Sequence, residues 1–495
     1  MLLGIDLGTS SVKATVIDER GVVLAAAARE YAIHTPQIGY AEQNPEDWYR
    51  ATCDAVRQIV AEADAAASVW AIGFSGQMHG TVLLNAQGRP VQPAIIWADQ
   101  RGAALIPEIT ERGAELWPTV GTLPAVGFMA VTLYWFMRHH PQIIDQTTAI
   151  VLPKDYLCFR FTGEISTEPS DAASTALLDI AKREWSHTLV TKLGLPGQLL
   201  PNIRESHAVV GTLNASAAGD LGLPSGIPVV AGCADQAAQA LGSGLLEQRL
   251  GSVTIGTGGQ LFVPLNAPRV DALLRLHTFC HAPPDQWYVL GAMLSAGLSL
   301  RWLRNILGMA DDLNGYEQLA AHAAAVPIGA EGLLFLPYLI GERAPLMDAK
   351  ARGGFVGLTL SHGVGHMARA VMEGVAFNLR QIFEIVKDFA PVDSLIASGN
   401  GLANPVWRQI VADVLNRPLR FLQAGERAGV GAALLGGIGT GIIDGFDEAT
   451  ALVRASQVEH SLVVEPNPQA SAAHNEHFAR YGELYPALRG LFHRL

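Results

Sequence analysis

The chain has 495 residues, of which 49% are hydrophobic and 16% charged, with 51 glycines and a net charge of −12. This length predicts two to four domains, and the composition is typical of a compact α/β enzyme. A negative charge without a basic block argues against nucleic-acid binding. The longest apolar run, 428–443, is too short to span a bilayer. The four cysteines are scattered, which predicts reduced thiols in a cytoplasmic protein. The first residues contain no basic segment, so no signal peptide is expected.

The first predicted hairpin, residues 2–17, places a carboxylate beside a tight turn. The apolar strand LLGI ends at Asp6, and Gly8, Thr9 and Ser10 form the turn before a second strand. Backbone N–H groups and hydroxyls beside a carboxylate can bind phosphate and hold Mg²⁺, although a purely structural hairpin explains the same residues. No helix follows the turn, so it is neither a Walker loop nor a dinucleotide-binding fingerprint.

Two buried strands then end in short polar stretches. The first delivers Met78 and His79 between two glycines, which gives polar groups and an apolar wall in little space, as a pocket needs; a simple turn histidine is the alternative. The second strand, 94–97, is followed by Asp99 and Arg101. These two side chains could grip sugar hydroxyls or pair with each other as a surface salt bridge.

The rest of the chain is organised around residues 229–244, VVAGCADQAAQALGSG. A buried strand end and small residues lead to a single carboxylate, Asp235, at the start of a predicted helix. An acid beside the free N–H groups of a helix start is suited to act as a general base or to hold a metal ion. Helix capping by the same aspartate is the alternative.

The second half begins as the first does. Residues 252–264 predict a strand, a turn of Gly256, Thr257 and Gly258, and another strand, which suggests two duplicated phosphate-binding hairpins. A later strand, 394–398, ends in Gly399 and Gly401, with Leu402 after them and a helix from Asn404. Such glycines let a ligand approach the backbone closely, or they serve helix–strand packing. Residues 426–441 predict a helix packed through small residues.

Eight stretches in this order carry a resemblance to a known family: GIDLGTSSVK, SGQMHG, LPKDYL, SDAAST, CADQAAQALGSG, IGTGGQ, LPYLIGERAP and GFVGLTLSHG. From Leu2 to about Leu488 the chain resembles the FGGY carbohydrate kinases, and SGQMHG is typical of the members that act on xylulose. The resemblance implies an α/β fold of two actin-like ATPase (ribonuclease H-like) domains flanking a deep cleft. Residues 1–246 would form the sugar side and residues 247–495 the ATP side.

The resemblance also implies roles for individual residues. Asp235 matches the catalytic base, and Asp6 matches the acid that positions Mg–ATP, so both are expected near the metal. The expected sugar-binding residues are Met78, His79, Asp99, Arg101, Asp235 and Gln236. The expected ATP-binding residues are Gly8, Thr9, Ser10, Gly256, Thr257, Gly258, Gly399, Gly401, Leu402 and Asn404.

The implied activity is ATP-dependent, Mg²⁺-assisted phosphorylation of D-xylulose to D-xylulose 5-phosphate, and a homodimer is compatible with the family. The sequence departs from the usual pattern at Ala98, Gln236, Thr132 and Asn400. These departures leave open a kinase for another ketose or polyol, such as D-ribulose or L-xylulose. A non-catalytic sugar or nucleotide sensor is a further alternative, although it would have no reason to keep both Asp6 and Asp235.

Overall fold

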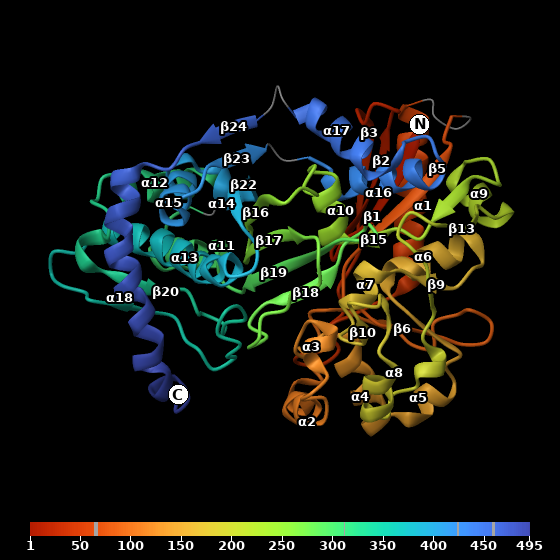
Figure 1. Ribbon diagram of the computed structural model, residues 1–495, viewed down its shortest axis with the longest axis horizontal. Helices are drawn as coiled ribbons and strands as arrows, with labels where there is room; N and C mark the ends of the chain where they lie inside the picture. Colours follow the sequence, from red (N-terminus) through yellow and green to blue (C-terminus); the bar gives the residue numbers. More distant parts are fainter. Residues whose placement is uncertain (64–67, 311, 423–424, 458–460) are drawn as a thin grey trace.

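The computed structural model describes residues 1–63, 68–310, 312–422, 425–457 and 461–495, which form two sheet-containing halves (Figure 1). Each half is built on a seven-stranded mixed sheet. One hydrophobic cluster runs through both halves and includes Leu2 of the first sheet and Val253 of the second. Within the described residues, no helix has the length and apolar character needed to cross a membrane.

The first sheet has the strand order β13-β14-β5-β1-β2-β3, with β15 also paired to β5. Its strands are β1 (Leu2–Leu7), β2 (Ser11–Ile17), β3 (Val23–Glu30), β5 (Ala71–Gly76), β13 (Val209–Thr212), β14 (Pro228–Val230) and β15 (Cys233–Ala234). The predicted first hairpin is confirmed, because β1 and β2 pair antiparallel. Strand β1 does not end at Asp6 but continues to Leu7, because it pairs on its other side with β5 over its whole length.

The second sheet has the order β18-β19-β17-β16-β22-β23-β24. Its strands are β16 (Arg249–Ile255), β17 (Gly259–Leu265), β18 (His277–Cys280), β19 (Trp287–Met293), β22 (Val392–Ser398), β23 (Leu419–Leu422) and β24 (Ser461–Val464). Strand β16 is antiparallel to β17 and parallel to β22, just as β1 is antiparallel to β2 and parallel to β5. The predicted likeness between the beginnings of the two halves is therefore confirmed.

The remaining strands form small two-stranded sheets outside these two cores. They are β4 (Glu42–Gln43), β6 (Val82–Leu84), β7 (Ala94–Ile95), β8 (Ala149–Val151), β9 (Ser166–Thr167), β10 (Leu178–Asp179), β11 (Glu184–Trp185), β12 (Asn202–Ile203), β20 (Leu334–Leu336) and β21 (Gly354–Val356). The strand predicted at 94–97 is therefore shorter than expected and stops before Trp97.

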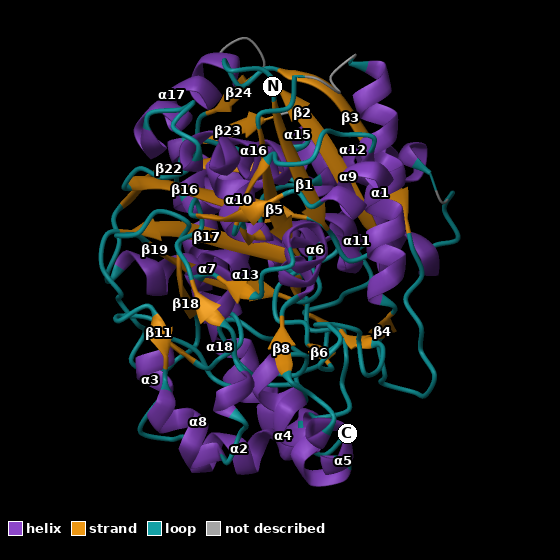
Figure 2. Ribbon diagram, turned by 90° about the vertical axis from the view of Figure 1, so that its right-hand side faces the viewer, coloured by secondary structure: helices purple, strands orange, loops and turns teal. Residues whose placement is uncertain are grey.

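The helices of the first half fall into two groups. Those near the sheet are α1 (Pro45–Glu62), α6 (Pro153–Thr162), α7 (Pro169–Ala173), α9 (Ala215–Leu221) and α10 (Asp235–Leu241). A separate lobe, at the bottom of both views (Figures 1 and 2), contains α2 (Ile106–Arg112), α3 (Trp117–Val120), α4 (Met129–His139), α5 (Pro141–Asp145) and α8 (His187–Leu193). Helix α1 begins at the predicted cap, because the Asn44 side chain accepts a hydrogen bond from the backbone N–H of Glu46.

The helices after the second sheet begins are α11 (Gly297–Ile306), α12 (Leu313–Ala324), α13 (Val364–Lys387), α14 (Asn400–Ala403), α15 (Pro405–Leu415), α16 (Arg427–Gly439), α17 (Gly445–Gln457) and α18 (Pro468–Phe492). Helix α13 packs against β17, β19 and α15. Helix α16 returns to the first sheet and packs on β1 and β5. The boundary at 246/247 stays a prediction.

Alternation along β1 explains how its two faces are covered. Leu3, Ile5 and Leu7 belong to the hydrophobic cluster that includes α1, whereas Leu2 belongs to the cluster that includes α16. Successive side chains of a strand point to opposite faces. The first sheet is therefore covered by α1 on one face and by α16 on the other.

Small residues let α16 approach both the sheet and α10, as the sequence predicts. A Cβ atom on Gly4 would lie 1.9 Å from the carbonyl oxygen of Gly429, and one on Gly73 would lie 1.9 Å from that of Ala432. A Cβ atom on Gly431 would lie 2.0 Å from the carbonyl oxygen of Ala238 in α10. Helix α10, which begins with Asp235, is therefore fixed by backbone-to-backbone packing on α16.

Replacing Gly431 with alanine is expected to lower the free energy of unfolding by about 1–3 kcal/mol, because the new methyl group meets a backbone that must move. The matched control is Gly219→Ala in α9. A Cβ atom at Gly219 would have nothing within 4 Å in the described structure, so this change should raise stability by about 0.5–1 kcal/mol. Urea unfolding of the two variants measures both effects. Equal shifts in the two variants would contradict the close packing of α10 on α16.

Candidate active site

Three parallel strands, β1, β5 and β15, bring Asp6 and Asp235 together near their carboxyl ends. Asp6 pairs with Ser75 across β1 and β5, and Cys233 of β15 pairs with Ser75 from the other side. Asp235 follows two residues later as the first residue of α10. The hydroxyl of Ser75 donates to Asp6 Oδ1 at 2.8 Å. The two aspartates predicted to act together are therefore close in the fold.

The electrostatics of the pair agree with this proximity. Burial, together with the negative charge of Asp6, raises the pKa of Asp235 to about 7, although hydrogen bonds with Gln236 lower it. Burial also raises the pKa of Asp6, while the hydrogen bond from Ser75 and the charge of Lys13 lower it. Each carboxylate disfavours the charge of the other. A proton or a cation placed between them is therefore stabilised.

Asp235 does not cap its helix in the described structure. Ala234 is the residue before α10, and no side-chain capping bond is found there among the described residues. Asp235 Oδ1 is buried and has no hydrogen-bond partner in the described part of the chain. Buried carboxylate oxygens usually have a partner, so this atom is available to a ligand.

The donor set fits Mg²⁺ held together with a bound nucleotide. Within the described ranges, no group of three or more His, Cys, Asp or Glu side chains could hold a metal on its own. Mg²⁺ usually takes one or two carboxylates and completes its shell with water and substrate phosphates. Asp6 and Asp235 supply two such carboxylates.

The turn after β1 is held by a hydrogen bond within it and by hydrogen bonds from Gln43 and Trp97. The N–H of Gly8 donates to the Ser11 carbonyl at 3.0 Å. The carbonyl of Thr9 accepts from Gln43 Nε2 at 2.7 Å, and its hydroxyl accepts from Trp97 Nε1 at 2.8 Å. Ser10 is exposed. Gln43 also accepts from Gln77 Nε2 at 2.9 Å, and sequence reasoning missed this buried glutamine.

His79 is held in an unusual backbone conformation, with φ of 74°. Its N–H donates to Ser174 Oγ at 3.1 Å, and its Nδ1 lies 2.6 Å from the Ser174 carbonyl oxygen. Because a carbonyl only accepts, Nδ1 carries the proton and Nε2 remains an acceptor. Burial lowers the pKa of His79 to about 3, so the ring is neutral. It stacks on Phe128 at 4.0 Å, while Met78 is buried.

Asp99 and Arg101 pair with each other, but in the interior rather than at the surface. Arg101 Nη2 lies 2.8 Å from Asp99 Oδ2, and these side chains are only 4% and 2% exposed. Asp99 Oδ2 also accepts from the N–H of Ala41 at 2.7 Å, and Arg101 also binds Glu42 at 2.7 Å. The pair therefore braces this part of the fold, and its contact with a sugar stays a prediction.

A cavity of about 540 Å³ lies in the second half. Among the residues predicted to bind ATP, it brings together Gly256, Thr257, Gly401 and Asn404. Its other lining residues are Gly297, Leu298, Leu300, Arg301, Leu313, Tyr316, Glu317, Asn400, Ala403, Pro405 and Trp407. Sequence reasoning missed those from α11 and α12, because no motif marks which faces of these two helices line a cavity. The cavity is large enough for a nucleoside.

Six predicted ATP-binding residues do not line this cavity. Gly8, Thr9 and Ser10 belong to the turn after β1, in the first half, and the other three lie near the cavity. Leu402 is fully buried in the core. Gly399 has φ of 89°, and a Cβ atom there would lie 2.4 Å from the carbonyl oxygen of Ile255. A Cβ atom on Gly258 would similarly lie 2.6 Å from the carbonyl oxygen of Met293. The two glycines therefore shape the turns around the cavity. Asn404, which does line it, also caps α15 through its Oδ1.

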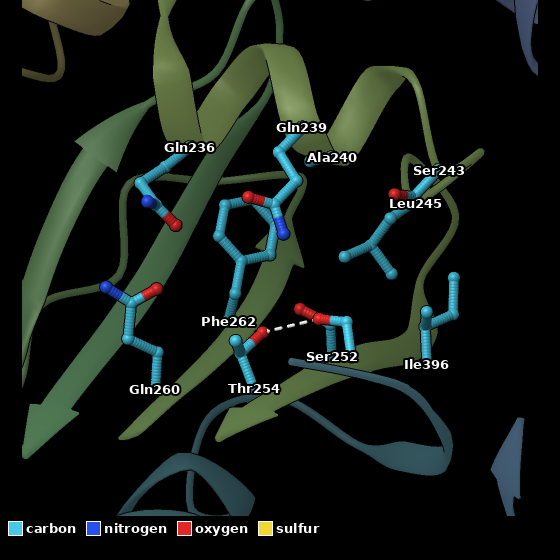
Figure 3. Close-up of a pocket in the computed structure, with 11 residues that line it drawn as sticks. Gln236, Gln239, Ala240, Ser243, Leu245, Ser252, Thr254, Gln260, Phe262 and Ile396 are labelled. Carbon is cyan, nitrogen blue, oxygen red and sulfur yellow. Dashed lines mark hydrogen bonds between the residues drawn. The ribbon is translucent and has the colours of Figure 1, made fainter. Parts of the chain in front are cut away.

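A narrow gap of about 20 Å³ separates α10 from the second sheet. Figure 3 shows Gln236 of α10 and Gln260 of β17 pointing toward each other across it. On the floor of the gap, the hydroxyls of Thr254 and Ser398 lie 2.8 Å apart. Gln236 therefore faces the second half of the molecule rather than the core of the first.

Tyr288 of β19 is a further residue that sequence reasoning missed. Its hydroxyl is buried and finds no hydrogen-bond partner among the residues described. Burial raises its pKa, and so do the negative charges of Asp235 and Asp171. A phenol from the second half therefore lies in the field of the carboxylates of the first. No sequence motif distinguishes it from the core aromatics Phe262 and Phe279 around it.

Comparisons with known proteins agree with the geometry of the site. The chain is 36% identical over 450 residues to a xylulose kinase from Bacillus subtilis (strain 168), covering 90% of both chains. It superposes with a TM-score of 0.92 and 34% identity on a crystal structure of a "xyloylose kinase" from Brucella ovis, covering 99% of both chains. A gluconate kinase from Lactobacillus acidophilus gives a TM-score of 0.93 at 26% identity, again over 99% of both chains.

These neighbours share the actin-like ATPase fold, so the predicted fold class is confirmed. Residues 1–242 match the N-terminal domain of the FGGY family of carbohydrate kinases, and residues 251–440 match its C-terminal domain. The predicted resemblance is confirmed as well. The chain belongs to the FGGY family of carbohydrate kinases, and it is a sugar kinase.

Proposed function

We propose that the protein transfers the γ-phosphoryl group of ATP to the terminal hydroxyl of D-xylulose, giving D-xylulose 5-phosphate and ADP. The observation that carries this proposal is the pair of half-buried carboxylates, Asp6 and Asp235, near the carboxyl ends of β1 and β15 in the first sheet. Asp235 has an unpartnered oxygen among the described residues and a pKa raised to about 7, and Asp6 lies beside it. A base that titrates near neutral pH suits proton removal from an alcohol.

In this proposal, Asp235 accepts the proton of the attacking hydroxyl as the new P–O bond forms and the bond from the γ-phosphorus to the bridging oxygen of ADP breaks. In a loose transition state, the bond from the hydroxyl oxygen to phosphorus is still weak, so the hydroxyl becomes acidic only late in the reaction. Asp235 therefore need not be a strong base. His79, neutral and with Nε2 as an acceptor, can receive a hydrogen bond from a sugar hydroxyl. Met78 adds an apolar wall beside it.

The nucleotide would lie mainly in the second half. The 540 Å³ cavity would take the adenosine, with Gly401 and Asn404 close to it. The turns at Gly8–Ser10 and Gly256–Gly258 would approach the phosphates from the two halves. Mg²⁺ held by Asp6 and Asp235 would neutralise phosphate charge. We accordingly propose residues 1–246 as the sugar side and 247–495 as the ATP side.

The choice of D-xylulose is supported by several curated relatives named xylulose kinase, at 32–37% identity. A second candidate is another FGGY substrate, because the chain also superposes closely on the gluconate kinase. Ala98 and Gln236 lie at positions where many xylulose kinases have asparagine, which is a further reason to compare substrates directly.

A coupled ADP-release assay with Mg–ATP and six substrates tests the proposal: D-xylulose, D-ribulose, L-ribulose, L-xylulose, glycerol and gluconate. We expect the highest kcat/KM for D-xylulose. A polar group of the binding site that is left without its sugar hydroxyl typically costs about 1–3 kcal/mol, so the preference should be at least about fivefold. A preference for another substrate would overturn the choice of sugar and leave the carboxylate pair in place. No turnover with any of them by folded protein would favour the sensor.

A further inference from the structure

Helix α7 and the residue after it, Ser174, contact both segments of the proposed catalytic site. This stretch lies in the SDAAST motif, 170–175, to which the phosphoryl-transfer scheme gives no role. Ser170, Asp171 and Ser174 are all fully buried. Ser170 and Ser174 each form a hydrogen bond with a residue that is distant in the sequence, Ala234 and His79 respectively, so the stretch does more than complete its own short helix.

Ser170 holds the residue immediately before Asp235. The backbone N–H of Ala234 donates to Ser170 Oγ at 3.0 Å, and Ser170 Oγ donates to Glu168 Oε1 at 3.0 Å. Ser170 therefore acts as acceptor and donor at once, and its hydroxyl orientation is fixed. Since Ala234 is the last residue of β15, this bond sets where α10 begins and where Asp235 points.

Ser174 holds His79 by two bonds. Its hydroxyl accepts from the backbone N–H of His79 at 3.1 Å, and its carbonyl accepts from His79 Nδ1 at 2.6 Å. The hydroxyl in turn donates to Asp171 Oδ1 at 3.3 Å. The first bond helps to fix the left-handed backbone at His79, a conformation that is strained for a residue other than glycine. The second bond fixes the ring tautomer.

The two serines are held by the same cluster of buried charged side chains. Glu168 accepts hydrogen bonds from the N–H groups of Ser170 and Asp171, both at 2.8 Å. Lys154 Nζ lies 3.6 Å from Glu168 and 3.7 Å from Asp171, and all three side chains are fully buried. Buried charges bound this way resist displacement, because a shift would leave one of them without its partner.

We infer that Ser170 and Ser174 are positioning residues, the first for Asp235 and the second for His79, mounted on one element so that base and sugar-binding histidine keep a fixed separation. The inference rests on the proposed function. It explains why the segments of His79 and Asp235, which follow different strands, are both bonded to helix α7 and its C-cap residue.

The experiment compares Ser170→Ala and Ser174→Ala with a matched control, Thr52→Val. Thr52 is also fully buried, and within the described residues its hydroxyl donates only to the Trp48 carbonyl of its own helix, at 2.7 Å. We expect Ser170→Ala to lower kcat by about 10–100-fold through misplacement of the base, with the Kd for D-xylulose changed less than about threefold. Ser174→Ala should raise that Kd by about tenfold, the effect of one lost hydrogen bond, and lower kcat less.

Calorimetric titration with D-xylulose gives Kd, and ADP release gives kcat. Hydrogen exchange, which needs no substrate, should rise in peptides covering Ala234 in Ser170→Ala and in peptides covering His79 in Ser174→Ala. Thr52→Val should alter none of these quantities. The inference is wrong if the two serine variants lose kcat and affinity in parallel, if Thr52→Val matches them, or if exchange at both peptides stays unchanged. Failure of the wild type to phosphorylate any sugar would instead contradict the proposed function, while the exchange experiment would still test the two tethers.

Discussion

Asp235→Asn is expected to lower kcat by about 10²–10⁴-fold, the usual contribution of a positioned general base. Asparagine keeps the size of the side chain but cannot accept the proton of the sugar hydroxyl. It also removes one of the two negative charges available to a cation. Because Asp235 makes no capping bond within the described structure, α10 should keep its first turn, and the thermal unfolding temperature should stay close to that of the wild type.

The coupled ADP-release assay measures the loss, and calorimetric titration tests whether D-xylulose still binds. The matched control is Asp271→Asn, which neutralises another largely buried carboxylate, one paired with Arg275 at 2.8 Å and outside both proposed binding sites. That variant should keep kcat within about threefold. If Asp235→Asn retained a rate near that of the wild type, its assignment as the base would be wrong.

The pH dependence gives a second check on the same residue. Burial raises the pKa of Asp235 to about 7, so the base form is lost on acidification at a higher pH than for an ordinary aspartate. We expect kcat/KM for Mg–ATP to fall about tenfold per pH unit below about pH 7 and to level off above it. Mg²⁺ stabilises the carboxylate, so the same limb in kcat should lie at lower pH. Asp235→Asn should lack this limb.

The strands and the main motifs could be predicted from sequence because local pattern determines them. Alternation of apolar residues marks β1 and β2, and Asn44 followed by Pro45 marks the start of α1. Asp235 could be singled out because a lone acid among small residues is a local feature. For these elements the structure differs from expectation mainly in strand ends.

Other features depend on tertiary contacts that no local pattern specifies. From the sequence, Asp99 and Arg101 could bind sugar hydroxyls or form a surface salt bridge. Only the fold shows that they pair with each other in the interior. Likewise, Arg301 and Tyr316 line the nucleotide-sized cavity because α11 and α12 pack together beside it. Tyr288 approaches the carboxylates from the other half of the chain. The roles of such residues can be recognised only in the folded structure, where segments distant in the sequence come together.

The largest difference between sequence and structure concerns Lys154. In the sequence it is one lysine of the LPKDYL stretch, and exposure is the ordinary expectation for a lysine. In the structure it is fully buried and serves three carboxylates, Asp155 at 2.6 Å and Glu168 and Asp171 at slightly longer distances. Burial raises the pKa of Asp171 well above its ordinary value, as do the charges of Asp155 and Glu168, whereas Lys154 lowers it.

Lys154→Met is therefore expected to lower the free energy of unfolding by about 3–5 kcal/mol, since it leaves three buried carboxylates without their cation. The control Lys182→Met removes a lysine that is 72% exposed and 3.3 Å from Asp179, and it should cost at most about 1 kcal/mol. Urea unfolding at pH 8 measures the difference between the two variants.

The loss of unfolding free energy in Lys154→Met should also depend on pH, and the pKa values of the carboxyl groups determine whether the loss grows or shrinks as the pH falls. Burial already raises the pKa values of Asp155 and Asp171 in the folded protein above those in the unfolded chain, and without the lysine these values rise further. Protonation then favours the folded state, so the loss should shrink as the pH is lowered from 8 toward 5 and the carboxylates take up protons. A loss that is equally large at both pH values would mean that lost packing of the lysine chain, rather than uncompensated charge, causes the instability. A loss no larger than that of Lys182→Met would show that the buried cluster does not depend on its cation.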